Sequence, residues 1–396
     1  MRILMVAPEA FFTPHGTPLS VYYRIAELEA IGHEIEVLTY PVGEPPPGLR
    51  TRIHRSLGPP FATAIRPGPS YLKVAFDVLL AVKLMRLLFR YEFDVIYAHE
   101  EAAFLAALAT QLVHIPFIYE MHSSLPAQMA ARHFSTHGLG CTLFGLMERH
   151  TVRRARAIVA TSPGVAAVAC QIEPAAHVLT LVNCYLFDAA VSAERICQLR
   201  QALGLLASHK VVLYTGSFVE LQSLDLLVRA IPLVMEREPQ ARFVFVGGRA
   251  DEIRGLRRLA SALGVSHTLT LEPTRPPEEM PVFMAASEVL VSPRVAGLNA
   301  PGKLMCYLNA GRPVVATDCP VHTQILNREI AILTPPTPDG LAQGILTAFT
   351  DRRLVATITS NARHLIEKTY NRHERLASYE RLFDGLWSDT TTSGCR

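Results

Sequence analysis

Short apolar runs alternate with longer stretches of helical spacing along nearly the whole of this 396-residue chain. A strand, a helix and a second strand in that order form a βαβ unit, and repeated units build a parallel sheet covered by helices on both faces. Ligands of such sheets bind at the carboxyl ends of the strands. The alternation therefore predicts an α/β fold whose functional residues follow its strands.

The alternation occurs in two series. The first predicts a helix over residues 20–31, ended by Gly32, and strands over 2–7, 34–40, 93–98, 117–120, 157–161 and 178–182. The second predicts strands over 210–214, 241–246, 268–271, 289–292 and 313–317, with helices over 224–238, 255–263, 280–286 and 301–310. We expect two Rossmann-like, doubly wound domains facing across a cleft, which is a natural ligand site.

The chain therefore divides into four segments. They are a first domain over 1–184, a short helix and linker over 185–209, a second domain over 210–368, and a last helix with its tail over 369–396. Near the end, helical spacing over 341–350, 355–368 and 372–386 is broken close to Tyr370. The polar residues 389–396 are expected to fray.

The charge balance argues against nucleic acid as a partner. The 38 Lys and Arg residues are nearly balanced by 35 Asp and Glu, so the net charge of +3 gives no long-range field. The seven cysteines form no C-x-x-C pair and are odd in number, which argues against a zinc cluster and a disulfide framework. No signal-peptide core follows Met1, and we expect a cytoplasmic protein with free thiols.

The most apolar helical stretch covers residues 71–91. Five charged residues interrupt it, so it is too polar to span a bilayer: Lys73, Asp77, Lys83, Arg86 and Arg90. The spacing fits an amphipathic helix packed on a sheet. Its basic bias leaves a membrane-surface helix as the alternative, which would place the protein at the inner face of the membrane.

Polar residues follow several strands of the first domain. The loop before the first helix contains Gly16, which permits close approach of a ligand, and Ser20, which is predicted to cap the helix. The loop matches neither the dinucleotide fingerprint nor the P-loop. His122 follows the strand at 117–120, where it could bind a sugar or stabilise a transition state. His99 occupies a similar position and is the competing candidate.

Residues 292–318 carry the strongest chemical signal, reading strand, loop, helix, glycine and strand. Asn299 is predicted to cap the helix, with Pro301 near its start. Lys303 falls in the first turn, where its charge opposes the helix dipole. A diphosphate held by the helix amides, Lys303 and Arg294 would remove that conflict. An ordinary solvated lysine is the alternative.

Two further strand ends carry glycine. Gly216 follows the strand at 210–214 and precedes a helix, a geometry that suits phosphate approach. Gly247 and Gly248 follow the next strand, where a simple turn is the more economical interpretation.

The combined pattern resembles the retaining glycosyltransferases of family 4, which have the GT-B fold. Ser-Pro-Arg-x-x-Gly-x-Asn-x-Pro-x-Lys, then Tyr-Leu-x-Ala-Gly-x-Pro-Val-Val-Ala-Thr-Asp, is similar to the family's donor-binding region. Gly-Thr-Pro-Leu-Ser with Ile-Gly-His-Glu-Ile-Glu-Val-Leu-Thr resembles its acceptor-side opening, and Thr-Gly-Ser-Phe resembles the start of its donor domain. The last helix is similar to the one that crosses back to the first domain, so the likeness covers nearly the whole chain.

The resemblance implies that the chain is a hexosyltransferase-type enzyme. A nucleoside diphosphate sugar, with UDP or GDP as the nucleotide, would be held mainly by the second domain. Its sugar would pass with retention to a sugar, a lipid-linked or a small-molecule acceptor on the first domain. The family requires no metal or other cofactor, since basic side chains and helix amides stabilise the leaving diphosphate.

The resemblance also assigns roles to individual residues. It implies catalytic roles for His122, near the reacting centre, and for Lys303 and Arg294 at the diphosphate. The implied donor-binding residues are Gly16 and Thr17 in the closing loop, Gly216 and Ser217 beside the diphosphate, Thr274 and Arg275 at the base, Leu298, Asn299 and Ala300 at the sugar, and Cys306 at the ribose.

Some positions depart from the family pattern. The two glutamates that the family carries eight positions apart are Leu298 and Cys306 here, and the second of them commonly contacts the ribose. The family's Arg and Lys after the Thr-Gly turn are Ser217 and Gln222. These departures motivate an alternative, a non-catalytic sugar-nucleotide-binding or scaffold relative. An epimerase of the same fold ranks last, because the chain shows no paired carboxylate motif.

Acceptor loops such as residues 41–69 are rich in proline and predicted to lack regular structure.

Overall fold

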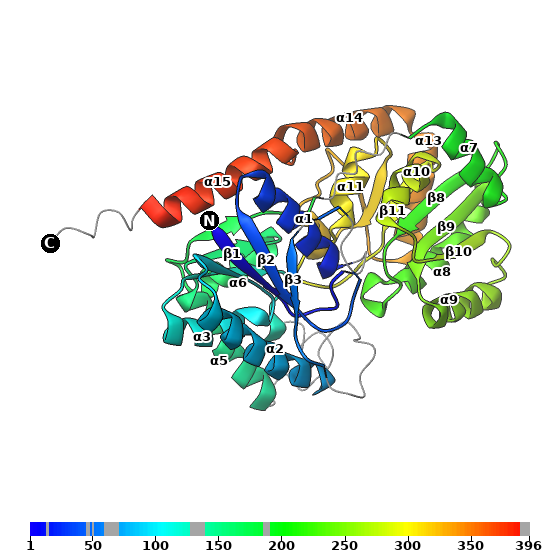
Figure 1. Ribbon diagram of the computed structural model, residues 1–396. Coiled ribbons are helices and arrows are strands. Elements are labelled where there is room, and N and C mark those ends of the chain that lie inside the picture. Colours follow the sequence, from blue (N-terminus) through cyan, green and yellow to red (C-terminus); the bar gives the residue numbers. More distant parts are fainter. Residues whose placement is uncertain are drawn as a thin grey trace. The chain divides into compact units, whose positions relative to one another are not determined.

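The structure, a computed structural model, describes residues 1–12, 16–44, 48–49, 51–58, 71–126, 139–184 and 191–388. Its contacts divide the chain into unit 1, which comprises Met1–Val182 and Arg372–Arg396, and unit 2, which comprises Asn183–Asn371. Each unit is built around one parallel sheet with helices packed against it (Figure 1). The predicted frayed tail at 389–396 lies outside the described residues.

Unit 1 contains a seven-stranded sheet in the order β3-β2-β1-β4-β5-β6-β7. The strands are β1 (Arg2–Ala7), β2 (Glu34–Thr39), β3 (Arg52–Arg55), β4 (Val95–His99), β5 (Phe117–Met121), β6 (Ala157–Ala160) and β7 (Val178–Thr180). The order reverses between β1 and β4, which is where a doubly wound sheet opens a crevice for ligands. The described helices are α1 (Thr17–Ala30), α2 (Tyr71–Arg90), α3 (Ala102–Val113), α5 (Leu139–Arg154), α6 (Pro163–Ile172) and α15 (Arg372–Ser388).

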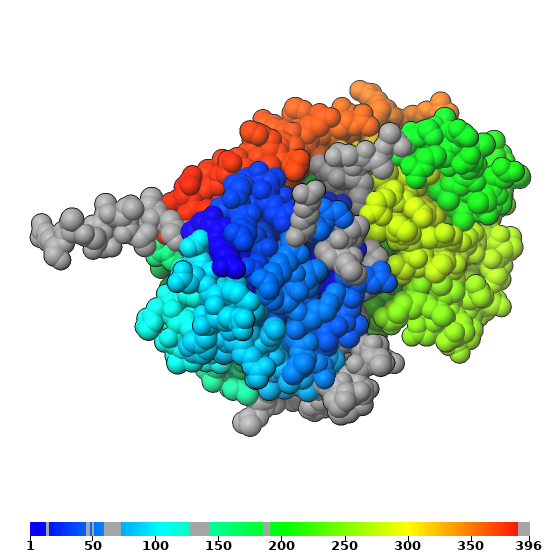
Figure 2. Space-filling view, viewed as in Figure 1, coloured from blue at the N-terminus to red at the C-terminus, as the bar shows by residue number. Residues whose placement is uncertain are grey.

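Helices cover both faces of this sheet (Figure 1). The core on one face joins Ile25 of α1 with Tyr379 and Phe383 of α15 and with the strands, so the last helix belongs to the first domain, as predicted. On the opposite face (Figure 1), α2 packs against α3, and the surfaces of these two helices adjoin in the space-filling view (Figure 2). Among the described helices, none combines the length and the apolar character that a membrane span requires.

Unit 2 contains a six-stranded sheet in the order β10-β9-β8-β11-β12-β13. The strands are β8 (Lys210–Thr215), β9 (Ala241–Gly248), β10 (Leu269–Pro273), β11 (Val289–Ser292), β12 (Val314–Thr317) and β13 (Ile332–Thr334). The order reverses between β8 and β11, where Val212 and Leu213 pair with Val289 and Leu290. The helices are α7 (Ala193–Ala202), α8 (Leu224–Met235), α9 (Ala250–Ala262), α10 (Met280–Ala285), α11 (Lys303–Asn309), α12 (Pro320–Thr323), α13 (Pro338–Thr350) and α14 (Arg352–Thr369).

The structure differs from the sequence expectations at several elements. β3 lies within residues 41–69, which were predicted to lack regular structure, and its His54 contacts Glu36 of β2 at 2.5 Å. Helix α9 begins at Ala250 instead of 255, because the Glu252 carboxylate accepts the Arg249 backbone N–H at its start. The short helix expected within 185–209 is α7, and it packs against α10 as a part of unit 2. Strand β13 was not predicted.

Candidate functional site

Two cations lie at the switch point of unit 2, where β8 and β11 end. Lys303 is the first residue of α11, and its ammonium group donates to the Thr215 carbonyl at 3.1 Å and to the Gln222 Oε1 at 3.3 Å. The same nitrogen lies 3.7 Å from the centroid of the Tyr214 ring. Arg294 follows β11 and is close enough for its charge to act on Lys303. Strand ends from both halves of the sheet therefore contribute to one basic site.

Neither cation has a carboxylate within ion-pair distance among the residues that the structure describes. Arg294, only 4% exposed, donates to the Ala296 carbonyl at 2.7 Å and to the Asn299 Oδ1 at 3.2 Å, both neutral groups. Burial lowers the pKa of Arg294 to about 10. Burial, and secondly the charge of Arg294, holds the pKa of Lys303 well below its usual range. Because desolvated cations without a counter-ion are costly, this site favours an anionic ligand.

Glycines keep the space around these cations open. A Cβ at Gly297 would lie 2.0 Å from a terminal nitrogen of Arg294, and one at Gly216 would lie 3.4 Å from the Lys303 ammonium. A Cβ at Gly247 would lie 2.4 Å from the Gly216 carbonyl oxygen. All three have φ between 118° and 129°, which side chains rarely adopt. Gly247, interpreted above as a simple turn, is therefore part of the wall of the basic site.

Substituting Gly247 by alanine is expected to destabilise unit 2 by about 3 kcal/mol, because both strain and a backbone clash arise. Gly264 is a matched control, since its φ is 72° and no atom lies near the added Cβ. Gly264→Ala should cost about 1 kcal/mol. Urea denaturation of both variants measures the difference, and equal losses would contradict the close approach of Gly247 to Gly216.

The start of α11 differs from the sequence expectation. The helix begins at Lys303, two residues after Pro301, and no side chain caps it. Asn299 was predicted as the cap and is not, because its side chain accepts from Arg294 instead. At the other end of the helix, Tyr307 ties α11 to the sheet, since its hydroxyl accepts the Thr215 backbone N–H at 2.7 Å.

The remaining predicted donor-binding residues lie along the same edge of unit 2. The Ser217 carbonyl accepts from the Tyr214 hydroxyl at 2.8 Å, and the Thr274 hydroxyl lies 3.5 Å from the Gly247 carbonyl. Arg275 is exposed and paired with Glu272 at 2.6 Å, so its charge is compensated. The Leu298 carbonyl accepts from Gln324 at 3.0 Å. Two others are partly exposed, Ala300 beside Asn299 and Cys306 on α11.

In unit 1, Gly16 and Thr17 lie where α1 begins. Gly16 adopts φ 62° and ψ −138°, a conformation open only to glycine in practice, and Thr17 is the first helical residue. Ser20, which was predicted to cap this helix, lies inside it and is buried. The prediction of the cap was wrong because the helix starts three residues earlier than its apolar spacing indicates.

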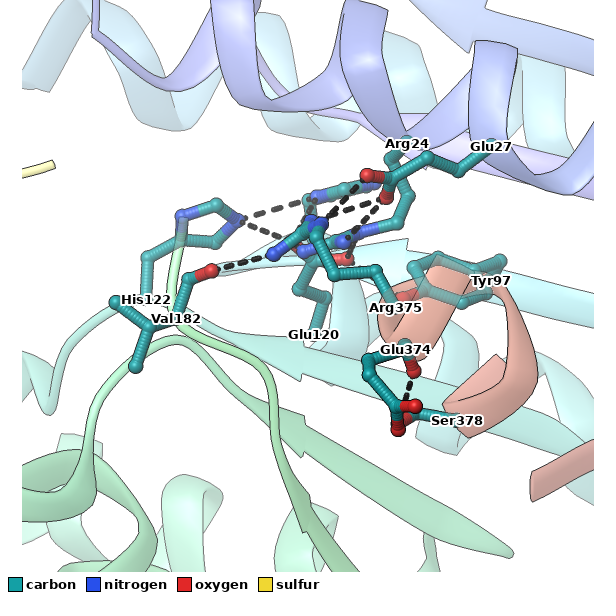
Figure 3. Close-up of polar contacts among 10 residues, drawn as sticks. Arg24, Glu27, Tyr97, Glu120, His122, Val182, Glu374, Arg375 and Ser378 are labelled. Carbon is teal, nitrogen blue, oxygen red and sulfur yellow. Dashed lines mark hydrogen bonds and ion pairs between the residues drawn. The ribbon is translucent and has the colours of Figure 1, made fainter. Parts of the chain in front are cut away.

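His122 lies just beyond β5 and is bound to a buried carboxylate (Figure 3). Its Nε2 is 3.2 Å from the Glu120 Oε1 and 3.3 Å from the His99 Nδ1. Because a carboxylate only accepts, Nε2 carries a proton, and the other ring nitrogen points away from this group (Figure 3). Burial lowers the pKa of His99 to about 3, so His99 is a neutral neighbour. His99 and His122 are thus parts of one buried cluster, in which His122 is 6% exposed and His99 is fully buried.

A chain of buried charges extends from Glu120 to the last helix (Figure 3). The Arg24 guanidinium binds both Glu120 oxygens, at 2.7 and 2.8 Å, and also Glu27 at 3.1 Å. Arg375 of α15 binds both oxygens of Glu27, at 2.7 and 3.0 Å, and the Val182 carbonyl at 2.5 Å. Two cations and two carboxylates therefore alternate and compensate one another. We call Arg375, Glu27, Arg24 and Glu120 the buried charge chain.

The buried charge chain keeps Glu120, the carboxylate bound to His122, in its ionised form. Although burial alone would raise it, the pKa of Glu120 is held well below its usual range by Arg24, with the hydrogen bond from His122 adding to the effect. Ligand atoms of His99, Glu120 and His122 lie within 4.8 Å of one another, a spacing that a metal ion could use. Arg24 donates hydrogen bonds to both Glu120 oxygens. A metal ion bound there would therefore lie beside the positively charged guanidinium group. The arrangement instead favours a hydrogen-bonded cluster that orients His122.

Other acidic groups line the same edge of unit 1. Burial raises the pKa of Glu100 to about 7, and Glu100 accepts from the Ser123 hydroxyl at 3.1 Å. Burial also raises the pKa of Asp77 to about 6, where the Tyr40 hydroxyl donates to it. Carboxyl groups with such pKa values can accept or donate hydrogen bonds near neutral pH. This chemistry suits a polyhydroxylated ligand.

Several residues of the two sites carry little sign of a function in the sequence. Glu120 had one signal, a carboxylate inside an apolar strand, which implies a buried partner. Arg24 had a similar signal within the apolar spacing of α1. Gln222 was noted only as a departure from the family pattern. Tyr307 is marked in the sequence only by its position among the apolar residues of a helix.

Comparison with known proteins agrees with this geometry. Residues 209–351 match the family model of glycosyl transferases group 1, and residues 14–182 match that of glycosyltransferase family 4. An uncharacterised glycosyltransferase of Methanocaldococcus jannaschii is 23% identical over 291 residues, which are 71% of this chain and 72% of that protein. The GDP-mannose-dependent alpha-(1-6)-phosphatidylinositol monomannoside mannosyltransferase of Mycolicibacterium smegmatis is 34% identical over 125 residues. That match is 30% of this chain and only 32% of the relative's length.

The fold is also shared with solved structures. Anabaena HepE, solved in complex with UDP-glucose, superposes with a TM-score of 0.77 at 20% identity, covering 98% of this chain and all of that one. Both units of the chain thus match models of one enzyme group, and both carry the Rossmann-type sheets of its fold. The chain belongs to the family 4 glycosyltransferases, enzymes of the GT-B fold that use nucleotide-sugar donors.

Proposed function

We propose that this enzyme transfers a hexose from a nucleoside diphosphate sugar to an acceptor hydroxyl, with retention at the anomeric carbon and without a metal ion. The observation that carries the proposal is the pair of cations at the switch point of unit 2. Lys303 and Arg294 are desolvated and have no carboxylate counter-ion among the described residues. Cations and glycine-lined space suit a diphosphate bound directly, whereas a Mg²⁺ site would call for carboxylate ligands.

The names of similar proteins support UDP or GDP as the nucleotide. HepE was solved with UDP-glucose, and the Mycolicibacterium smegmatis relative is named for GDP-mannose. That relative is also named for a phosphatidylinositol monomannoside acceptor. We therefore propose a sugar, lipid-linked or small-molecule acceptor, bound at the acidic edge of unit 1, and a cytoplasmic enzyme that contacts the inner face of a membrane.

A thermal-shift screen with UDP-, GDP-, ADP- and dTDP-sugars tests the nucleotide. We expect one nucleotide class to raise the melting temperature by several degrees, since a ligand at 100 times its Kd stabilises by about 2.7 kcal/mol. Turnover of that donor should persist in EDTA, and NMR of the product should show the donor's anomeric configuration. Loss of turnover in EDTA would exclude metal independence, and an inverted product would exclude retention.

A non-catalytic sugar-nucleotide-binding relative is the second candidate. Two departures from the family pattern favour it. Cys306 lies where the family carries a glutamate, and the Gln222 side chain accepts from Lys303 without adding positive charge. A clear thermal shift combined with neither hydrolysis nor transfer of any donor would select this candidate.

A further inference from the structure

Helix α2 carries a stripe of exposed apolar side chains. Val74, Val78, Val82 and Phe89 recur at spacings of four, four and seven residues, which places them on one side of the helix. Phe89 is 74% exposed and Val78 is 58% exposed. The other side of the helix is buried in unit 1. A soluble helix normally places charged residues where this stripe lies.

The neighbouring helices extend the stripe. Leu108 and Leu112 of α3 and Leu143 and Leu146 of α5 are each more than half exposed. The helices pack α2 against α3 and α3 against α5, and Gln111 bonds a side chain of α5 at 3.4 Å. We call these eight apolar residues, together with the Lys and Arg residues of α2 and α5, the basic apolar face. Scattered exposed apolar residues are ordinary, but a contiguous set marks an interaction surface.

The charged residues of these helices are almost all basic. The three helices contain seven Lys or Arg residues and two carboxylates, Asp77 and Glu148. Both carboxylates are turned inward, since Asp77 accepts from Tyr40 and the buried Glu148 accepts from Ser124. Five of the basic residues have no carboxylate partner among the described residues: Lys83, Arg86, Arg90, Arg149 and Arg154.

We infer that the basic apolar face docks on a bilayer that contains anionic lipids. Apolar side chains would enter the interface while the basic groups meet lipid headgroups. A second copy of this chain is a poorer occupant, because it would bring like charges together. The inference deepens the membrane contact within the proposed function by naming the surface that makes it.

Sedimentation with vesicles tests this surface without any need for turnover. We expect the full chain to bind vesicles of equal parts phosphatidylcholine and phosphatidylglycerol, but not phosphatidylcholine alone, and to be released by high salt. Each basic residue near such a surface contributes about fivefold in partition. Arg86→Glu with Arg149→Glu should therefore lower binding more than tenfold, and Val78→Asp with Val82→Asp should do the same.

Arg254→Glu with Arg258→Glu is the matched control, because these exposed residues carry the same charge on α9, a helix without an exposed large hydrophobic side chain. This variant should bind vesicles like the wild type. Equal binding by all variants, or no preference for anionic vesicles, would overturn the inference. So would a dimer in analytical ultracentrifugation that Val78→Asp with Val82→Asp dissociates. Nucleotide thermal shifts, measured on the same variants, should be unchanged, so failure of vesicle binding is distinguishable from failure of the proposed transferase function.

Discussion

Lys303→Ala is expected to lower the turnover number about a thousandfold while the chain stays folded. In the transition state of sugar transfer, negative charge develops on the leaving diphosphate. A cation without a counter-ion at that place stabilises this charge without reorganisation. With Ser217 and Gln222 in place of the basic residues that the family pattern leads one to expect, the proposed mechanism assigns most of this stabilisation to Lys303 and Arg294.

The free energy of unfolding distinguishes a catalytic role of Lys303 from a structural one. The Lys303 ammonium bonds only neutral oxygens, and its pKa is well below the ordinary 10.5 because burial disfavours the charged form. Removing the charge should change the free energy of unfolding by less than about 1 kcal/mol. Lys210→Ala is the matched control: Lys210 is a partly exposed lysine of β8, paired with Glu238, and should retain full turnover. Full activity in Lys303→Ala would remove Lys303 from the mechanism.

The same lysine gives a pH dependence with a definite sign. Only the protonated ammonium attracts the diphosphate, so donor affinity should fall as pH rises through the folded-state pKa of Lys303, which lies below 10.5. Bound diphosphate opposes this loss by favouring the charged form. Lys303→Arg should move the fall to higher pH, even where the different shape of the guanidinium lowers turnover. Isothermal titration at a series of pH values on both sides of neutrality measures both effects.

Much of the fold could be predicted from the sequence, because strand and helix periods alternate clearly. The position of β3 could not, because prolines surround its four residues and the strand forms through tertiary contacts, chiefly its pairing with β2. The boundaries of helices were less certain than their existence. Ser20 and Asn299 have good capping side chains, yet α1 and α11 begin elsewhere.

The basic site of unit 2 could be predicted as a set of strand ends, since parallel strands bring Gly216, Arg294 and Lys303 to one edge. The lack of a carboxylate counter-ion among the described residues could not be predicted, because it depends on how side chains far apart in the sequence pack around Lys303 and Arg294. The same holds for the buried charge chain. Arg24 and Arg375 are 351 residues apart in sequence, and only the packing of α15 on α1 lets both bind Glu27.

Arg24→Met is expected to destabilise unit 1 by about 3–5 kcal/mol, because it removes one partner of a buried ion pair. The substitution leaves Glu120, which is fully buried, without its cation, and removes one partner of Glu27. Arg24→Met with Glu120→Met removes both charges of one pair and should recover much of the loss, because apolar groups of similar volume replace a buried ion pair well. Arg153→Ala breaks the more exposed pair with Glu173 and should cost less than about 1 kcal/mol.

The pH dependence of stability distinguishes the loss of charge compensation from a mere loss of packing. In the wild type, the folded-state pKa of Glu120 lies below its unfolded value, so its stabilisation is present above the unfolded pKa and is lost as pH falls through the folded pKa. In Arg24→Met, burial without the cation should raise that pKa above the unfolded value, so stability should fall as pH rises from about 5 to about 8. The double variant lacks this carboxylate and should lose that slope, although His99, His122 and Glu27 remain beside the site. Urea denaturation at a series of pH values measures the free energy of unfolding of the wild type, the single variant and the double variant. A parallel slope in the single and double variants would mean that Arg24 does not hold the charge of Glu120, and the orientation of His122 by that carboxylate would lose its physical basis.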